Sequence, residues 1–130
     1  MCKFLTEPQS SQTIFAAVPK SNKLCYKHTA GEDQNQYVRM AAKISNNDLN
    51  FLALLDAENG LWKHDRAGIT NDYGFCQISP IYHSQVVNDP RFYKDPQWQL
   101  EQCYRLYIGG TPFYGKANIW KTKNNFTCPQ

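Results

Sequence analysis

One carboxylate in the sequence lies where proton transfer is favoured. Glu58 follows the apolar stretch at residues 51–55 (FLALL), and the spacing predicts a helix over residues 47–58. Burial of that helix and the negative end of its dipole would both keep the proton on a carboxyl at its C-terminal end. Such a group can protonate a leaving oxygen as a general acid. The alternative is a helix-end Glu58 that is simply solvated.

A second motif follows at a defined distance. Gln77 lies 19 residues after Glu58, inside the segment YGFCQI at residues 73–78, and Glu58 itself opens the segment ENGLW. Together these resemble the catalytic signature of the lytic transglycosylase and goose-type lysozyme superfamily. That signature has Glu-Ser-Gly at the end of a buried helix, then a loop and a Gly-Leu-Met-Gln-Ile turn. Here Asn59 stands in place of the serine.

The resemblance covers roughly residues 46–108. It includes a later helix that starts at Asp95-Pro96 and runs into a tyrosine-containing stretch. The family usually continues into a helix with an Ala-Tyr-Asn element, which this sequence lacks; Tyr114 is the candidate for that role.

The resemblance implies a glycosidase that cleaves the MurNAc-GlcNAc β-1,4 bond of peptidoglycan glycan strands without a metal or cofactor. Glu58 would act first as acid and then as base. In a lytic transglycosylase the 6-hydroxyl of the sugar attacks the anomeric carbon and gives a 1,6-anhydro product. The substrate's N-acetyl group would assist, so that no second carboxylate is required.

A goose-type hydrolase would instead activate a water, with help from a loop carboxylate. Asp65 and Asp72 lie in the corresponding loop, although both are also typical turn formers. Because neither is an unambiguous second carboxylate, the sequence favours the anhydro product. A catalytically silent lysozyme-like protein that binds glycan or serves a structural role is a further alternative.

Several further residues are candidates for substrate contacts. Gln77 and the adjacent backbone at Ile78 would hydrogen-bond the acetamido groups. Tyr73, Trp62 and Tyr114 would stack on sugar faces, since an aromatic ring offers an apolar face with a polar edge. The alternatives are a buried glutamine that satisfies backbone groups and aromatic rings that pack in the core.

The elements that position these residues are expected to be mostly helices. The fold class is mostly α (α+β, lysozyme-like), a helical domain with a small turn-rich or β insertion at residues 63–75, beside the active-site cleft. Further helices are expected over residues 33–45, from Ser79-Pro80 to Val87, and after Asp95-Pro96. Asn46 or Asn47 is the expected N-cap of the Glu58 helix.

We expect a single domain over residues 1–130. It divides into an N-terminal arm (1–32, with at most a short helix around Thr13–Val18), a catalytic core (33–108) and a tail without clear periodicity (109–130).

The five cysteines favour disulfides over a metal site, because no Cys-x-x-Cys pair is present. Two bridges among five cysteines can form in about 15 ways. Cys103 lies on the inner stripe of its helix, which favours a bridge to Cys76; Cys25 and Cys128 are then the second pair, with Cys2 unpaired. Buried free thiols are the alternative.

The bulk composition narrows the classes of partner. The net charge of +3 favours approach to an anionic bacterial wall but lacks the clustered basic residues of a nucleic-acid binder. No apolar run is long enough to span a membrane. We expect a monomer outside the cytoplasm, a mature form in which Met1 replaces a removed leader. In a lipoprotein, Cys2 would carry the lipid.

Overall fold

The computed structural model describes residues 23–129. The expectations for Cys2 and for a helix around Thr13–Val18 lie outside the described residues. Within them the chain is mostly helical, as the sequence predicts. No helix of this part is both long and apolar enough to cross a membrane.

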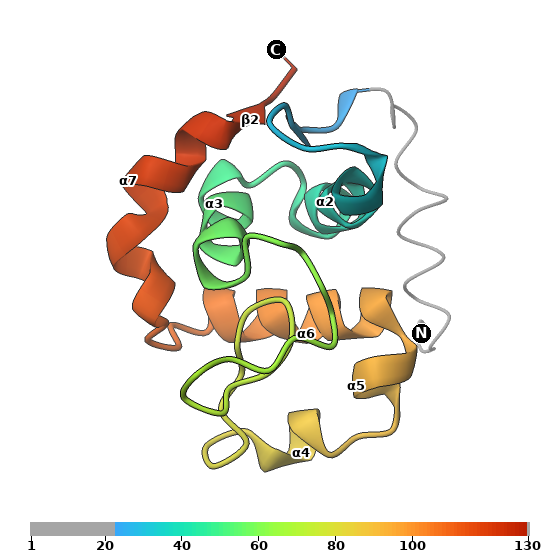
Figure 1. The fold of residues 1–130 in the computed structure, drawn as a ribbon, viewed down its shortest axis with the longest axis vertical. Coiled ribbons are helices and arrows are strands. Elements are labelled where there is room, and N and C mark those ends of the chain that lie inside the picture. The colour runs from blue at the N-terminus through green and yellow to red at the C-terminus, as the bar shows by residue number, and fades with distance from the viewer. Residues whose placement is uncertain (1–22, 130) are drawn as a thin grey trace, which may run out of the picture.

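The central element is α3 (Leu49–Glu58), which α2 (Glu32–Ser45) and α7 (Ile119–Thr122) flank on opposite sides (Figure 1). The remaining elements are α4 (Ser84–Val87), α5 (Arg91–Lys94), α6 (Pro96–Ile108), the 3-10 helices η2 (Tyr114–Asn118) and η3 (Lys123–Asn125), and the two-stranded antiparallel sheet of β1 (Tyr26–Lys27) and β2 (Phe126–Thr127).

Helix α3 is fully buried along its apolar stretch at residues 51–55. Its N-cap is Asp48, one residue after Asn47 and two after Asn46, and the Asp48 side chain accepts the Phe51 N–H at 3.2 Å. The predicted caps Asn46 and Asn47 were wrong. Both have positive φ values (56° and 63°), so they form the left-handed turn that ends α2 rather than the extended N-cap conformation.

Helix α6 begins as predicted, with the Asp95 side chain accepting the Trp98 N–H at 3.0 Å and a proline at the first position. The helix predicted from Ser79 begins later, at Ser84. The Ser79 hydroxyl accepts the Ile81 N–H at 3.2 Å, and this local turn replaces the first helical turn.

The tail packs along α3 and returns to the start of the described chain (Figure 1). The Thr122 hydroxyl donates to the Ala53 carbonyl at 2.6 Å, across 69 residues of sequence. Two disulfides join Cys25 to Cys128 and Cys76 to Cys103, the two pairs that the sequence analysis favoured. The first joins the β1 and β2 ends; the second attaches the loop after α3 to α6.

Candidate functional site

A pocket of about 650 Å³ lies at the C-terminal end of α3. Its walls come from the loop that follows α3 and from the segment between α6 and η2. The lining residues are Glu58, Thr70, Asp72, Gln77, Ile78, Ser79, Tyr82, His83, Thr111, Pro112, Phe113 and Tyr114.

The Glu58 carboxyl is half-buried and held by the tail. Its Oε2 accepts the backbone N–H of Gly115 at 2.8 Å. A Cβ at position 115 would lie only 3.0–3.1 Å from the side-chain atoms of Glu58, so glycine is what permits this close approach. Sequence analysis missed Gly115, because its contact with Glu58 spans 57 residues.

Burial raises the pKa of the Glu58 carboxyl above its ordinary value. The Gly115 N–H opposes the rise because it stabilises the carboxylate, while the negative charge of Asp72 adds to it. The net direction is upward. Glu58 therefore holds its proton at higher pH than an ordinary glutamate, which is the property of a general acid.

Asn59 fastens the loop to the end of α3. Its buried amide nitrogen donates to the Gly74 carbonyl at 3.0 Å and to the Lys63 carbonyl at 2.7 Å. Asn59 thus connects the helix that carries Glu58 to the turn that carries Gln77.

Gln77 has a positive φ of 54° and borders the pocket. Its side-chain nitrogen donates to the Gly74 carbonyl at 3.0 Å. Its Oε1 lies so close to Gly68 that a Cβ atom at position 68 would be only 2.0 Å from this oxygen. The amide nitrogen therefore satisfies the loop's own backbone, which is the alternative that the sequence left open. Ile78 is buried beside it in the pocket wall.

Gln99, which sequence analysis missed, holds the same loop from α6. Its fully buried side chain accepts the Phe75 N–H at 2.7 Å and donates to the His64 carbonyl at 2.9 Å and the Phe92 carbonyl at 2.7 Å. A glutamine four residues before Cys103, on the same inner stripe, was the available signal.

Trp62 is buried and does not line the Glu58 pocket, which contradicts its predicted stacking role. The side chain is only 1% exposed, and its Nε1 donates to the Asp56 carboxylate at 2.8 Å. The ring packs against Phe75, with centroids 6.2 Å apart. The Trp62 side chain turns inward because the buried Asp56 carboxylate accepts its indole N–H.

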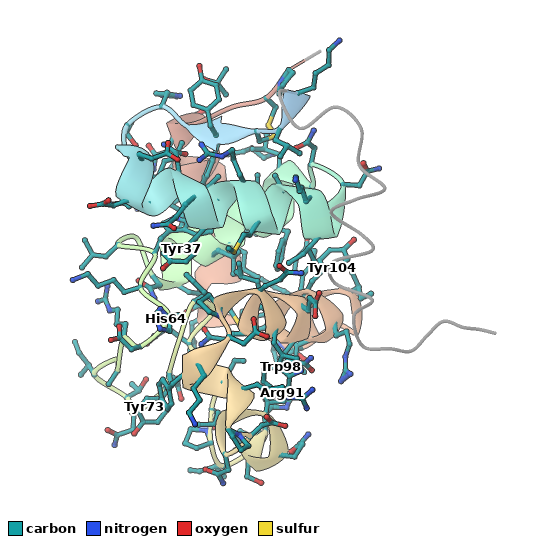
Figure 2. The ribbon with its side chains drawn as sticks, turned by 90° about the vertical axis from the view of Figure 1, so that its right-hand side faces the viewer. Tyr37, His64, Tyr73, Arg91, Trp98 and Tyr104 are labelled. Carbon is teal, nitrogen blue, oxygen red and sulfur yellow. A yellow bond between two sulfur atoms is a disulfide. The ribbon has the colours of Figure 1, made fainter. Side chains whose placement is uncertain are left out.

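Tyr73 and Asp65 do not line the Glu58 pocket, in contrast to their predicted roles. The Tyr73 backbone pairs with Ile78 through two hydrogen bonds, at 3.0 and 2.7 Å, and its half-buried side chain packs against the core. Figure 2 shows Tyr73 on the loop below His64. Asp65 borders a different hollow, together with Tyr37 and His64.

Asp72 and Tyr114 do line the pocket with Glu58. Tyr114 is 86% exposed at the start of η2, and Tyr82, which also lines the pocket, is 80% exposed. Sequence analysis did not single out Tyr82. The site thus combines one half-buried acid, a second carboxylate and two exposed aromatic rings.

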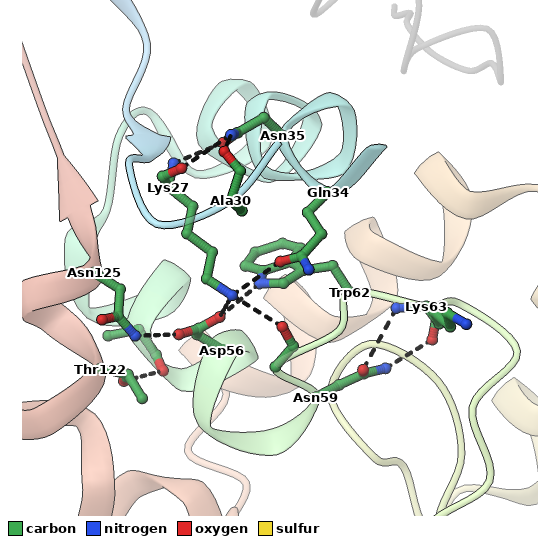
Figure 3. Close-up of polar contacts among 12 residues, drawn as sticks. Lys27, Ala30, Gln34, Asn35, Asp56, Asn59, Trp62, Lys63, Thr122 and Asn125 are labelled. Atoms are coloured by element: carbon green, nitrogen blue, oxygen red, sulfur yellow. Dashed lines mark hydrogen bonds and ion pairs between the residues drawn. The ribbon is translucent and has the colours of Figure 1, made fainter. Parts of the chain in front are cut away.

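A buried ion pair supports the end of α3 behind the pocket (Figure 3). Lys27 Nζ lies 2.9 Å from Asp56 Oδ1 and donates to the Gly60 carbonyl at 2.9 Å. Asp56 also accepts from Trp62, and from the Asn125 amide at 2.8 Å. This network joins β1, the end of α3 and the tail, and so fixes the backbone on both sides of Glu58.

Residues 23–129 contain no cluster of three or more His, Cys, Asp or Glu side chains able to hold a metal ion. No family model, curated protein or solved structure matches this chain.

Proposed function

We propose that this protein is a glycosidase that cleaves the MurNAc-GlcNAc β-1,4 bond of peptidoglycan, with Glu58 as the proton donor. The observation that carries the proposal is the Glu58 carboxyl itself: half-buried, open to a pocket, and raised in pKa. Glu58 and Gln77 line the same pocket, and this supports the roles that the sequence resemblance implies for them.

The pocket offers the contacts that a sugar chain needs. The exposed rings of Tyr82 and Tyr114 both border the pocket and present apolar faces for sugar stacking. Gln77 and Ile78 add one polar and one apolar side chain to the pocket lining. Glu58, which lines the same pocket, would protonate the glycosidic oxygen as the bond breaks.

The reaction could take two forms, and in the first the protein acts as a lytic transglycosylase. Glu58 donates its proton to the leaving oxygen, and the N-acetyl group of the substrate stabilises the developing positive charge. Glu58 then accepts the proton of the sugar's own 6-hydroxyl as that oxygen attacks the anomeric carbon. The products are a free 4-hydroxyl end and a 1,6-anhydro end, with no water consumed.

A second candidate, a lysozyme-type hydrolase, is favoured by the position of Asp72. This carboxylate shares the pocket with Glu58 and is close enough to contribute to its raised pKa. A second carboxylate can activate a water or stabilise the cationic sugar. The water would then leave a reducing end in place of the anhydro end.

Two matched variants separate these reactions. If the protein is a lytic transglycosylase, Asp72→Asn and Asp65→Asn should both keep most of the activity. If it is a hydrolase, Asp72→Asn should lose activity about a hundredfold or more, whereas Asp65→Asn, outside the pocket, should not. A loss in Asp65→Asn alone would contradict both forms.

The two disulfides are compatible with an oxidising compartment. Peptidoglycan lies outside the cytoplasm. We therefore place the proposed activity in a periplasmic or secreted protein that contacts glycan strands as a monomer.

The proposal is tested by Glu58→Gln, which removes the transferable proton and retains the shape of the side chain. The purified protein should clear a turbid suspension of peptidoglycan, and the variant should lose nearly all of this activity. Glu32→Gln, an exposed carboxylate paired only at the surface with Arg39, is the matched control. Circular dichroism should show an unchanged fold in both variants. Equal clearing by Glu58→Gln would contradict the mechanism.

A further inference from the structure

The C-terminal part of the chain carries charge of one sign. From residue 102 to residue 130 the sequence has no Asp or Glu, yet it contains Arg105, Lys116, Lys121 and Lys123. The three lysines are exposed on η2, α7 and η3. This segment therefore presents a positive surface, although the net charge of the whole chain is only +3.

Two of these lysines, Lys116 and Lys123, line an open hollow of about 630 Å³ between α3, α6 and α7. Trp120 is 68% exposed, although a tryptophan ring is largely apolar. The Lys121 ammonium lies 5.4 Å from its ring centroid, and the Lys116 ammonium lies 5.9 Å from the ring centroid of Tyr107. The lining residues are Asn50, Tyr107, Lys116, Ile119, Trp120 and Lys123.

Within residues 23–129, no carboxylate lines the hollow. Asp48 is the acidic neighbour of Tyr107: burial first, and then the charge of Asp48, raises the pKa of that phenol. The Asp48 carboxylate is engaged as the N-cap of α3, where it accepts the Phe51 N–H. The ammonium groups at the rim therefore face solvent without an anion among the lining residues.

We propose that this hollow binds an acidic carbohydrate polymer. Aromatic rings pack against the C–H faces of sugars, and ammonium groups pair with carboxylate or phosphate substituents. A nucleic acid would require a longer basic track with successive stacking platforms. A membrane surface would require an amphipathic helix, whereas α7 spans only four residues.

The hollow is separate from the Glu58 pocket. Asn50 in the hollow and Glu58 in the pocket lie eight residues apart on α3 (58 minus 50), or about 12 Å along the helix axis. The segment after α6 contributes to both, with residues 111–114 in the pocket and Lys116 onward in the hollow. The second site would hold the protein on an anionic wall, and it does not require that Glu58 be catalytic.

Binding of soluble polygalacturonate, with neutral dextran as the control ligand, tests the proposal by isothermal titration calorimetry. Polygalacturonate should bind and dextran should not, and the affinity should fall as salt increases. Trp120→Ala and the double variant Lys116→Gln/Lys123→Gln should each bind at least about fivefold more weakly. Lys63→Gln/Lys94→Gln removes the same charge from exposed sites elsewhere and should bind like the wild type.

Several results would overturn the proposal. They are absence of binding, unchanged binding in Trp120→Ala, an equal loss in the Lys63/Lys94 control, or tighter binding to poly-uridylate or to vesicles of anionic phospholipid. Because the assay measures no catalysis, Glu58→Gln should bind polygalacturonate as the wild type does. A failed clearing assay with intact binding would therefore reject the proposed enzyme activity and leave the second site standing.

Discussion

Substitution of Asp56, which forms a buried ion pair with Lys27, should strongly lower the stability of this fold. The two side chains are only 10% and 3% exposed, and the paired atoms lie 2.9 Å apart. Asp56→Asn removes the negative charge and leaves the Lys27 ammonium buried without it. The new amide group also brings a donor toward either the Trp62 indole N–H or the Asn125 amide, both of which donate to Asp56.

Removal of one partner from a buried ion pair costs about 3–5 kcal/mol, because the remaining charge is uncompensated. For a domain of roughly 100 residues, each kcal/mol lowers the melting temperature by about 4 °C or more. We expect Asp56→Asn to lower the melting temperature by at least about 12 °C. Lys27→Met/Asp56→Asn should recover part of that loss, since no unpaired ammonium then remains.

Urea unfolding of the disulfide-intact protein, followed by circular dichroism, measures the effect. The unfolding midpoint should fall in Asp56→Asn and rise again in the double variant, with similar slopes. A loss below about 1 kcal/mol in the single variant, or strict additivity of Lys27→Met and Asp56→Asn, would refute the assignment of this pair as an interdependent structural unit.

Two other predictions concern the site and its support. The pKa of Glu58 is raised in the folded protein. Between pH 4.5 and the raised value, the folded protein therefore binds more protons than the unfolded chain. Above that window Glu58 is ionised, and its ionisation destabilises the fold. Glu58→Gln should therefore melt no lower than the wild type at pH 7, and its advantage should shrink as the pH falls from the raised value toward 4.5. Clearing should persist above pH 4.5, and a lower melting temperature of Glu58→Gln at pH 7 would argue against the raised pKa. Cys76→Ser/Cys103→Ser should lower the free energy of unfolding by about 3–4 kcal/mol, from the entropy of a 27-residue loop, and weaken clearing with it; unchanged urea midpoints would reject this.

Local signals account for the parts of the fold that sequence analysis predicted. Asp95 and the proline after it mark the start of α6, because the cap and the first turn involve neighbouring residues only. The apolar stretch of α3 is equally local. The cysteine pairing followed from placing Cys103 on an inner helix face, and a helix face can be read from spacing.

Long-range contacts decided the parts that were missed. Nothing near position 115 indicates that its N–H will meet Glu58, and the contact of Thr122 with α3 spans a similar separation. Trp62 was wrongly expected at the substrate because residue type does not say which way a side chain turns. Its direction depends on Asp56, whose burial in turn depends on Lys27.

Mass analysis of muropeptides tests the central claim most directly. Purified sacculi would be digested with the wild-type protein and with Glu58→Gln, and the new glycan ends identified. We predict new ends with the wild type, as anhydro or reducing species that differ by one water, and almost none with Glu58→Gln. Absence of new ends with the folded wild type, or equal amounts with both proteins, would contradict the assignment of Glu58 as the catalytic acid of a peptidoglycan glycosidase.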